Sequence, residues 1–162
     1  MFRFKDSNFY ANQKCIPDFV SESSLQDGMC VQVDMQDHVA FASGTGGHIV
    51  LNEPLNRNEV HKVADGFGIC HNAKHVMKGE KPRLYELNAL IGVEFVTDDY
   101  KPTGVAPYIS NKPATFSVGD WFGYDEGGVL VPEGSANGLR FVVTAIEGDC
   151  LVMVLCERPH VE

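Results

Sequence analysis

The sequence lacks several features that mark common functional classes. No run approaches the roughly 20 apolar residues of a membrane-spanning helix, and the opening MFRFKDSNFY has no apolar stretch of the kind found in a secretory signal. No GKS or GKT sequence ends the glycine-rich loop SGTGGH (43–48), and no GxSxG occurs. We therefore expect a protein made in the cytoplasm that has no membrane partner, no bound cofactor and no recognisable catalytic residues.

Basic residues are also few. Thirteen Lys and Arg residues stand against 22 Asp and Glu residues, giving a formal net charge of −9. The densest basic stretch, KHVMKGEKPR (74–83), is short and interrupted by other residues. Because a phosphate backbone would repel such a chain, we expect no nucleic-acid partner. A protein partner with basic patches is compatible with this charge.

The cysteines show no disulfide or zinc pattern. There are five of them, an odd number at irregular spacing, and no CxxC pair occurs. Two near the C-terminus are six residues apart, so on one strand they would share a face about 20 Å apart, too far for a disulfide. We expect reduced, mostly buried thiols. The five are Cys15, Cys30, Cys70, Cys150 and Cys156.

One short segment, CHNAKH (70–75), contains two histidines that could ligate a metal. On a helix, His71 and His75 would share a face at a zinc-compatible spacing, whereas on a strand they would lie about 13 Å apart. Gly68 and Gly79 leave little room for a helix, and no second pair of ligands is evident. Since a structural zinc site normally has four ligands, we expect surface or packed histidines and no metal.

Glycine and proline, by contrast, are plentiful. Sixteen glycines and eight prolines are spread along the chain, which favours short strands joined by turns. Runs of alternating or β-branched apolar residues predict two clear hairpins, one with its turn near Gln36–Asp37 and one turning at EGD (147–149). An acidic DEGG turn (125–128) separates two further strands. The expected strand regions are 29–34, 39–41, 67–77, 91–99, 120–124, 129–132, 139–146 and 150–157.

Two other segments are not predicted as strands. LNEPLNRNEVHKVADG (51–66) is the best helical candidate, and residues 100–116, which carry three prolines, predict an extended crossing loop. The fold class is therefore all-β, a small barrel or sandwich of short antiparallel strands. We divide the chain into an N-terminal arm over 1–22, a β domain over 23–157 and a tail over 158–162.

The arm is predicted to bind another protein. Phe2 and Phe4 alternate with Arg3 and Lys5, and the apolar residues that follow show no clean period and have no partner strand nearby. Apolar residues in such a segment often bind a neighbouring chain. In the β domain, the aromatic cluster around Trp121 is typical of a core, and an oligomer interface is the alternative. The predicted protein-contact residues are Phe2, Phe4, Phe9, Tyr10, Trp121 and Phe122.

The C-terminal quarter of the chain, residues 114–157, resembles small phage-head decoration, or cement, proteins. Those proteins often carry a run of the type G-D-x-x-x-x-D-x-x-G-x-L-V-P, then a glycine-containing loop and a strand pair that ends in an apolar strand. Residues 117–157 of this segment stand as SVGDWFGYDEGGVLVPEGSANGLRFVVTAIEGDCLVMVLCE.

This resemblance implies a viral structural protein on the capsid surface of the virion. Such proteins bind the assembled major capsid protein, commonly as homotrimers, and brace the shell; no catalytic residues come with the family, so we expect no enzyme. Two alternatives remain open. The chain could be another phage virion component of the tail, neck or fibre base, or a small β-barrel enzyme or ligand-binding module.

Overall fold

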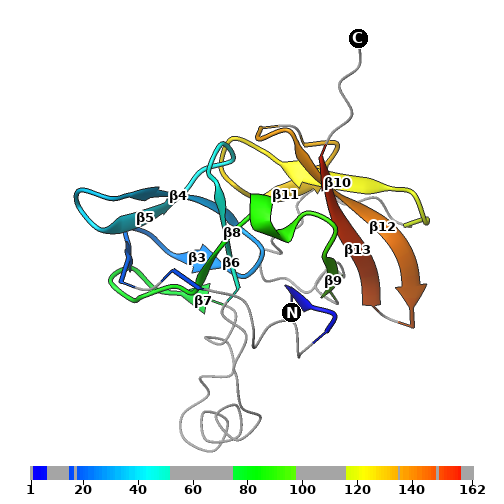
Figure 1. The fold of residues 1–162 in the computed structure, drawn as a ribbon, viewed down its shortest axis with the longest axis horizontal. Helices are drawn as coiled ribbons and strands as arrows, with labels where there is room; N and C mark the ends of the chain where they lie inside the picture. Colours follow the sequence, from blue (N-terminus) through cyan, green and yellow to red (C-terminus); the bar gives the residue numbers. More distant parts are fainter. Residues whose placement is uncertain are drawn as a thin grey trace, which may run out of the picture.

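The computed structural model of the chain describes residues 2–6, 15–16, 18–51, 75–97, 116–134, 136–148 and 150–157. Within these ranges the chain forms thirteen β-strands and one 3₁₀ helix, η2 (Figure 1). Their bounds are β1 Phe2–Phe4, β2 Val20–Ser21, β3 Leu25–Gln26, β4 Cys30–Asp34, β5 Val39–Ala42, β6 His48–Val50, β7 His75–Val76, β8 Leu84–Glu86, η2 Asn88–Leu90, β9 Glu94–Thr97, β10 Trp121–Tyr124, β11 Leu130–Pro132, β12 Leu139–Glu147 and β13 Cys150–Glu157.

The strands are arranged in three sheets. A six-stranded antiparallel sheet has the order β1-β9-β13-β12-β10-β11, and a five-stranded sheet has the order β2-β5-β4-β6-β8, in which only β2 and β5 run parallel. Strands β3 and β7 form a separate antiparallel pair. The predicted all-β class is confirmed: the sheets do not close into a barrel, and their arrangement is sandwich-like.

The main hydrophobic core lies between the six-stranded and five-stranded sheets. Alternate side chains of β12 and β13 point into it, as expected for strands with one face on a core. From the five-stranded sheet, β4, β6 and β8 contribute one residue each. The buried members include Phe2, Phe4, Cys30, Ile49, Tyr85, Phe95, Phe122, Tyr124, Phe141, Val143, Leu151, Met153 and Leu155.

A second, smaller core covers the other face of the five-stranded sheet. The side chains of Val31 and Ala40 project from that face and pack with Leu25 of β3 and Val76 of β7. Because β3 and β7 cover this face, the five-stranded sheet is apolar on both sides. The buried members of the second core are Phe19, Leu25, Val31, Ala40, Val50, Val76 and Leu84.

The predicted hairpin turn near Gln36–Asp37 is confirmed. Strands β4 and β5 pair from Val31↔Ala42 to Asp34↔Val39, which leaves residues 35–38 as the turn. The Asp34 carboxylate accepts hydrogen bonds from the backbone N–H groups of Gln36 (2.8 Å) and Asp37 (3.2 Å). An aspartate that bonds the backbone two residues on is a local turn former, which is why the sequence could locate this turn.

The two C-terminal hairpins are also confirmed. Strands β12 and β13 pair from Leu139↔Glu157 to Glu147↔Cys150, with a bulge between Val143 and Ala145. Strands β10 and β11 flank the DEGG turn, where the Asp125 carboxylate accepts from the Val129 N–H (2.9 Å). Gly128 has a φ of 77°, a conformation that glycine adopts without steric cost.

This acidic turn also joins the two large sheets. The Cys30 N–H donates to the Gly128 carbonyl (2.8 Å), and the Gly44 N–H donates to the Glu126 carbonyl (3.0 Å). Beside them, the buried Tyr124 hydroxyl donates to the Gly28 carbonyl (3.0 Å). The backbones approach so closely that a Cβ on Gly44 would lie 1.6 Å from the Asp125 carbonyl oxygen. The junction therefore requires glycine at this position.

A separate arm was expected over residues 1–22. At both ends of that segment, the structure instead shows strands that belong to the two large sheets. Strand β1 pairs with β9 at the edge of the six-stranded sheet, in the register Phe2↔Thr97 to Phe4↔Phe95. Residues 20–21 form β2 and join the other sheet. The alternation in FRF is a strand pattern, but the segment was assigned to a binding arm, because its partner strand lies far along the chain, where inspection of neighbouring residues could not find it.

Several predicted segments lie outside the described residues. They are the helical candidate beyond Leu51, residues 67–74 of the expected strand pair, residues 100–115 of the crossing loop, and the tail 158–162. Across the part of the chain that is described, no helix has the length and apolarity to cross a membrane.

Candidate interaction surface

Three of the predicted contact residues belong to the core. Phe2 is fully buried, Phe4 is 3% exposed and Phe122 is 1% exposed, so the prediction that these three side chains contact a partner is corrected. The Phe4 ring packs edge-on against Tyr85, with 5.5 Å between centroids, and also against Phe95. Trp121 is half-buried, while Phe9 and Tyr10 lie outside the described residues.

Trp121 lies on a different face of the six-stranded sheet from Phe122. Register places Trp121 directly opposite Val142, and Val142 directly opposite Val154, whereas Phe122 stands opposite Phe141 of the core. Directly opposed residues share a face of the sheet. This side points away from the main core, and we call it the outer face, defined by the half-buried side chains of Trp121, Val142, Val154 and Cys156.

The apolar character of the outer face follows from the sequence of β13. The run CLVMVLC is apolar at every position, whereas a strand with one solvated face normally alternates apolar and polar residues. Leu151, Met153 and Leu155 enter the core. Val152 alternates with the core residues of β13 and so lies on the outer face, but it is fully buried. The outer face is therefore most accessible further along β13 and toward β10.

Two charged residues flank the apolar side chains of the outer face. Arg140 stands opposite Cys156, and its Nε is buried without a hydrogen-bond partner. Glu133 follows the end of β11; its N–H donates to the Trp121 carbonyl (3.4 Å), and its side chain is exposed. In the described part of the chain neither side chain forms an ion pair. The sequence reasoning missed both, although Arg140 is the one charged residue in the run LRFVVTAI.

At the β1 edge of the six-stranded sheet, Lys5 forms two ion pairs. The Lys5 ammonium lies 3.2 Å from the Glu147 carboxylate and 3.7 Å from that of Glu94. The hydrogen bond to Glu147 is the largest cause of a raised pKa at Lys5. These contacts fasten the end of β1 to the sheet, although exposed pairs of this kind contribute little stability.

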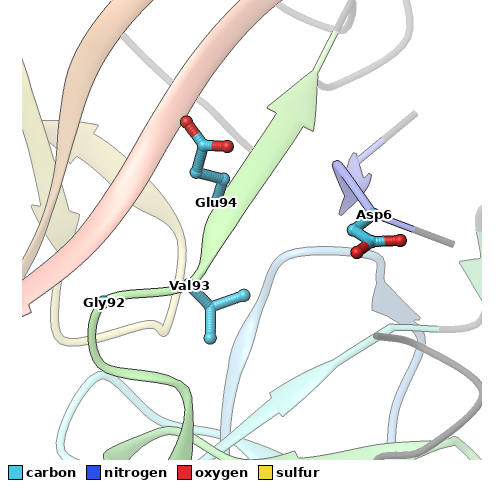
Figure 2. Close-up of a pocket in the computed structure, with 4 residues that line it drawn as sticks. All are labelled: Asp6, Gly92, Val93 and Glu94. Carbon is cyan, nitrogen blue, oxygen red and sulfur yellow. The ribbon is translucent and has the colours of Figure 1, made fainter. Parts of the chain in front are cut away.

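A small pocket lies beside this ion-pair network. Asp6, Gly92, Val93 and Glu94 line a hollow of about 260 Å³ between the end of β1 and the start of β9 (Figure 2). Its two carboxylates have no neighbouring nucleophile within the lining, and Glu94 already pairs with Lys5. The lining contains carboxylates and no nucleophile–base pair.

The cysteines only partly match the expectation of buried thiols. Cys30 is buried, and burial is the main cause that raises the pKa of its thiol to about 12, so it stays protonated. Cys15 is exposed, and Cys150 and Cys156 are half-buried, so the expectation fails for these three. Cys150 and Cys156 were expected to be buried because their strand is apolar, but the outer face is not fully covered.

Side-chain positions are described for neither of the two histidines that were considered as metal ligands. His71 lies outside the described residues, and of His75 only the backbone is described, in β7. Among the residues that are described, no three His, Cys, Asp or Glu side chains gather closely enough to hold a metal ion.

Comparison with known proteins adds no relative. No family model matches the sequence, and no curated protein and no solved structure matches it significantly. Inference about function therefore depends on the residues and surfaces described above.

Proposed function

We propose that the chain is a viral structural protein that binds an assembled capsid and stabilises it, as a decoration or cement protein. The observation that carries the proposal is the outer face of the six-stranded sheet. It presents a half-buried aromatic and aliphatic surface on an all-β scaffold, in which the resembling C-terminal segment forms β10 to β13.

An apolar outer face favours assembly with another protein surface. Contiguous apolar patches at the surface of a soluble protein mark interaction sites, and tryptophan is enriched at the centres of such sites. The outer face combines Trp121 with Val142 and Val154 on neighbouring strands. Rigid sheet positions hold these side chains in place, so little conformational entropy is lost when they are covered.

The net charge of −9 fits a position outside the shell. Packaged DNA repels an acidic protein, so the outer surface of a capsid is the electrostatically favoured side. In the proposed role the chain is made in the host cytoplasm, binds the major capsid protein where its subunits meet, and acts as a homotrimer. Several copies held together make weak individual contacts tight through avidity.

Sedimentation with capsid shells tests the proposal. The full chain is mixed with expanded shells of the virus that encodes it, and the pelleted fraction is measured over a range of chain concentrations. We expect saturable binding and a higher temperature of shell disruption. Val154→Glu places a charge on the outer face and should weaken binding at least about tenfold.

Gln32→Glu is the matched control, because Gln32 is exposed on β4 of the other sheet and the change adds the same charge. It should bind shells as the unaltered chain does. Failure of the unaltered chain to pellet with shells would exclude the proposed function. Equal binding by the Val154 variant would show that the outer face takes no part in it.

A further inference from the structure

We infer that Asn137 is a site of spontaneous covalent modification, at which its side-chain amide loses ammonia through attack by the backbone nitrogen of Gly138. The two residues lie in the turn that precedes β12. The reaction needs only water as a co-reactant, and it alters a contact at the junction of the two large sheets. It does not depend on the proposed function, because no capsid takes part in it.

The residue that follows Asn137 is the first reason for the inference. Asn137 is the only asparagine of the sequence that is followed by glycine. A side chain on the following residue hinders the approach of its backbone nitrogen to the asparagine side chain, and glycine has none. Gly138 has a φ of 72° and is exposed, and a Cβ placed on it would meet nothing within 4 Å. Solvent therefore reaches the attacking nitrogen.

The hydrogen bonds of the turn prepare the side-chain carbonyl for attack. The Leu139 N–H donates to the Asn137 Oδ1 (3.1 Å), which closes a turn through the asparagine side chain. The ring closed by this bond contains the peptide unit between Asn137 and Gly138, so the two reacting groups are held in one small turn. The same N–H stabilises the negative charge that develops on Oδ1 during attack.

The attacking nitrogen is itself unengaged. Within the described part of the chain, no group accepts a hydrogen bond from the Gly138 N–H. Removal of its proton by hydroxide therefore breaks no bond of the fold. Since the nitrogen attacks after it loses this proton, the reaction should become faster as the pH rises.

The chemical step is balanced without an oxidant or a reductant. The Gly138 nitrogen forms a bond to the Asn137 Cγ and closes a cyclic imide. The Cγ–Nδ2 bond breaks, and the amide nitrogen leaves as ammonia with the proton that Gly138 lost. One water molecule then opens the imide at either carbonyl, which gives aspartate or its isomer linked through the side-chain carboxyl.

The modification removes a contact between the two large sheets. The Asn137 Nδ2 donates to the Sγ of Cys30 (3.7 Å), and Cys30 is fully buried on β4. The product carboxylate has no proton to donate, and it places a negative charge beside this buried thiol. Because a buried polar group that loses its partner costs free energy, the modified chain should be less stable.

Incubation of the full chain at physiological temperature over a range of mildly alkaline pH provides the test. Proteolytic digestion and mass spectrometry measure conversion at each asparagine, and liberated ammonia is assayed separately. Asn88 is the internal control, because it is exposed in η2 and is followed by Ala89. We expect Asn137 to convert at least about tenfold faster than Asn88, and faster as the pH rises.

Two variants test the chemistry and its consequence. Gly138→Ala adds a methyl group to the attacking residue and should slow conversion about tenfold or more. Circular dichroism checks its folding, and Asn137→Gln, which must close a larger ring, replaces it if it unfolds. Asn137→Asp has the composition of one product, so its urea midpoint should be lower, and that of the incubated unaltered chain should fall toward it.

Three results overturn the inference. The first is an intact Asn137 in the native chain under conditions that convert it in the urea-unfolded chain, since the fold would then protect it. The second is conversion of Asn137 no faster than that of Asn88, or unaffected by the variant that blocks attack. The third is an unchanged urea midpoint after conversion, which would exclude the effect on the junction.

Discussion

Phe4→Ala distinguishes a core strand at the N-terminus from a binding arm. Phe4 is 3% exposed, and its ring contacts those of Tyr85 and Phe95 at centroid distances of 5.5 Å and 5.2 Å. If residues 2–4 were an arm for a partner, alanine at this position would leave the isolated domain unaffected. Since the ring lies between the two large sheets, its removal should leave a cavity.

The expected loss is large compared with the stability of a domain. Truncation of a buried phenylalanine to alanine costs about 3–5 kcal/mol, from lost burial and the residual cavity. Native domains are stable by about 5–15 kcal/mol. For a chain of this length each kcal/mol corresponds to roughly 2–4 °C, so the midpoint of thermal unfolding should fall by about 6–20 °C.

Urea unfolding followed by tryptophan fluorescence and circular dichroism measures the change. The urea midpoint should fall without a change in slope, because the exposed surface on unfolding is nearly the same. Lys5→Ala, one residue along, is the control and should shift the urea midpoint far less, since its ion pairs are exposed. A loss below about 1 kcal/mol for Phe4→Ala would refute the placement of β1 in the core.

Three further predictions concern the junction and the pH dependence. Gly44→Ala should destabilise by about 3 kcal/mol or more in urea, because its Cβ would overlap a carbonyl oxygen, whereas Gly47→Ala has open space and should be nearly neutral. Tyr124→Phe leaves a buried carbonyl without its donor and should cost about 1–3 kcal/mol; a neutral result would contradict the sheet-bridging bond. Burial lowers the pKa of His48 from its usual 6.5, so the unfolded state binds more protons. Stability should therefore fall as the pH drops below 6.5 through the lowered pKa, and His48→Gln should flatten that slope in urea titrations.

The sequence predicted the local pairings well because their determinants are local. The β4–β5 and β12–β13 hairpins have short turns, and Asp34 forms its turn through its own side chain. The alternation of Phe2 and Phe4 is compatible with a strand, but strand β1 was not predicted, because its partner β9 is remote in the sequence. The arm hypothesis followed from that missing partner.

The candidate surface was only partly predictable for a similar reason. Alternation places Trp121 and Phe122 on opposite faces, but it does not say which face meets the core. The apolar run in β13 is typical of a strand with both faces covered, an inference that was not drawn from the sequence. The Arg140 Nε has no acceptor in the described part of the chain. The sequence could not show this, because it depends on which residues the neighbouring strands bring beside that atom.

Electron cryomicroscopy of capsids tests the central claim most directly. Shells of the virus to which the proposed function assigns this chain are imaged before and after addition of the purified protein. The account predicts added density on the outer surface, repeated at symmetry-related positions, into which the two packed sheets fit. Shells that show no added density under saturating protein, or protein found only at a tail or neck, would contradict it.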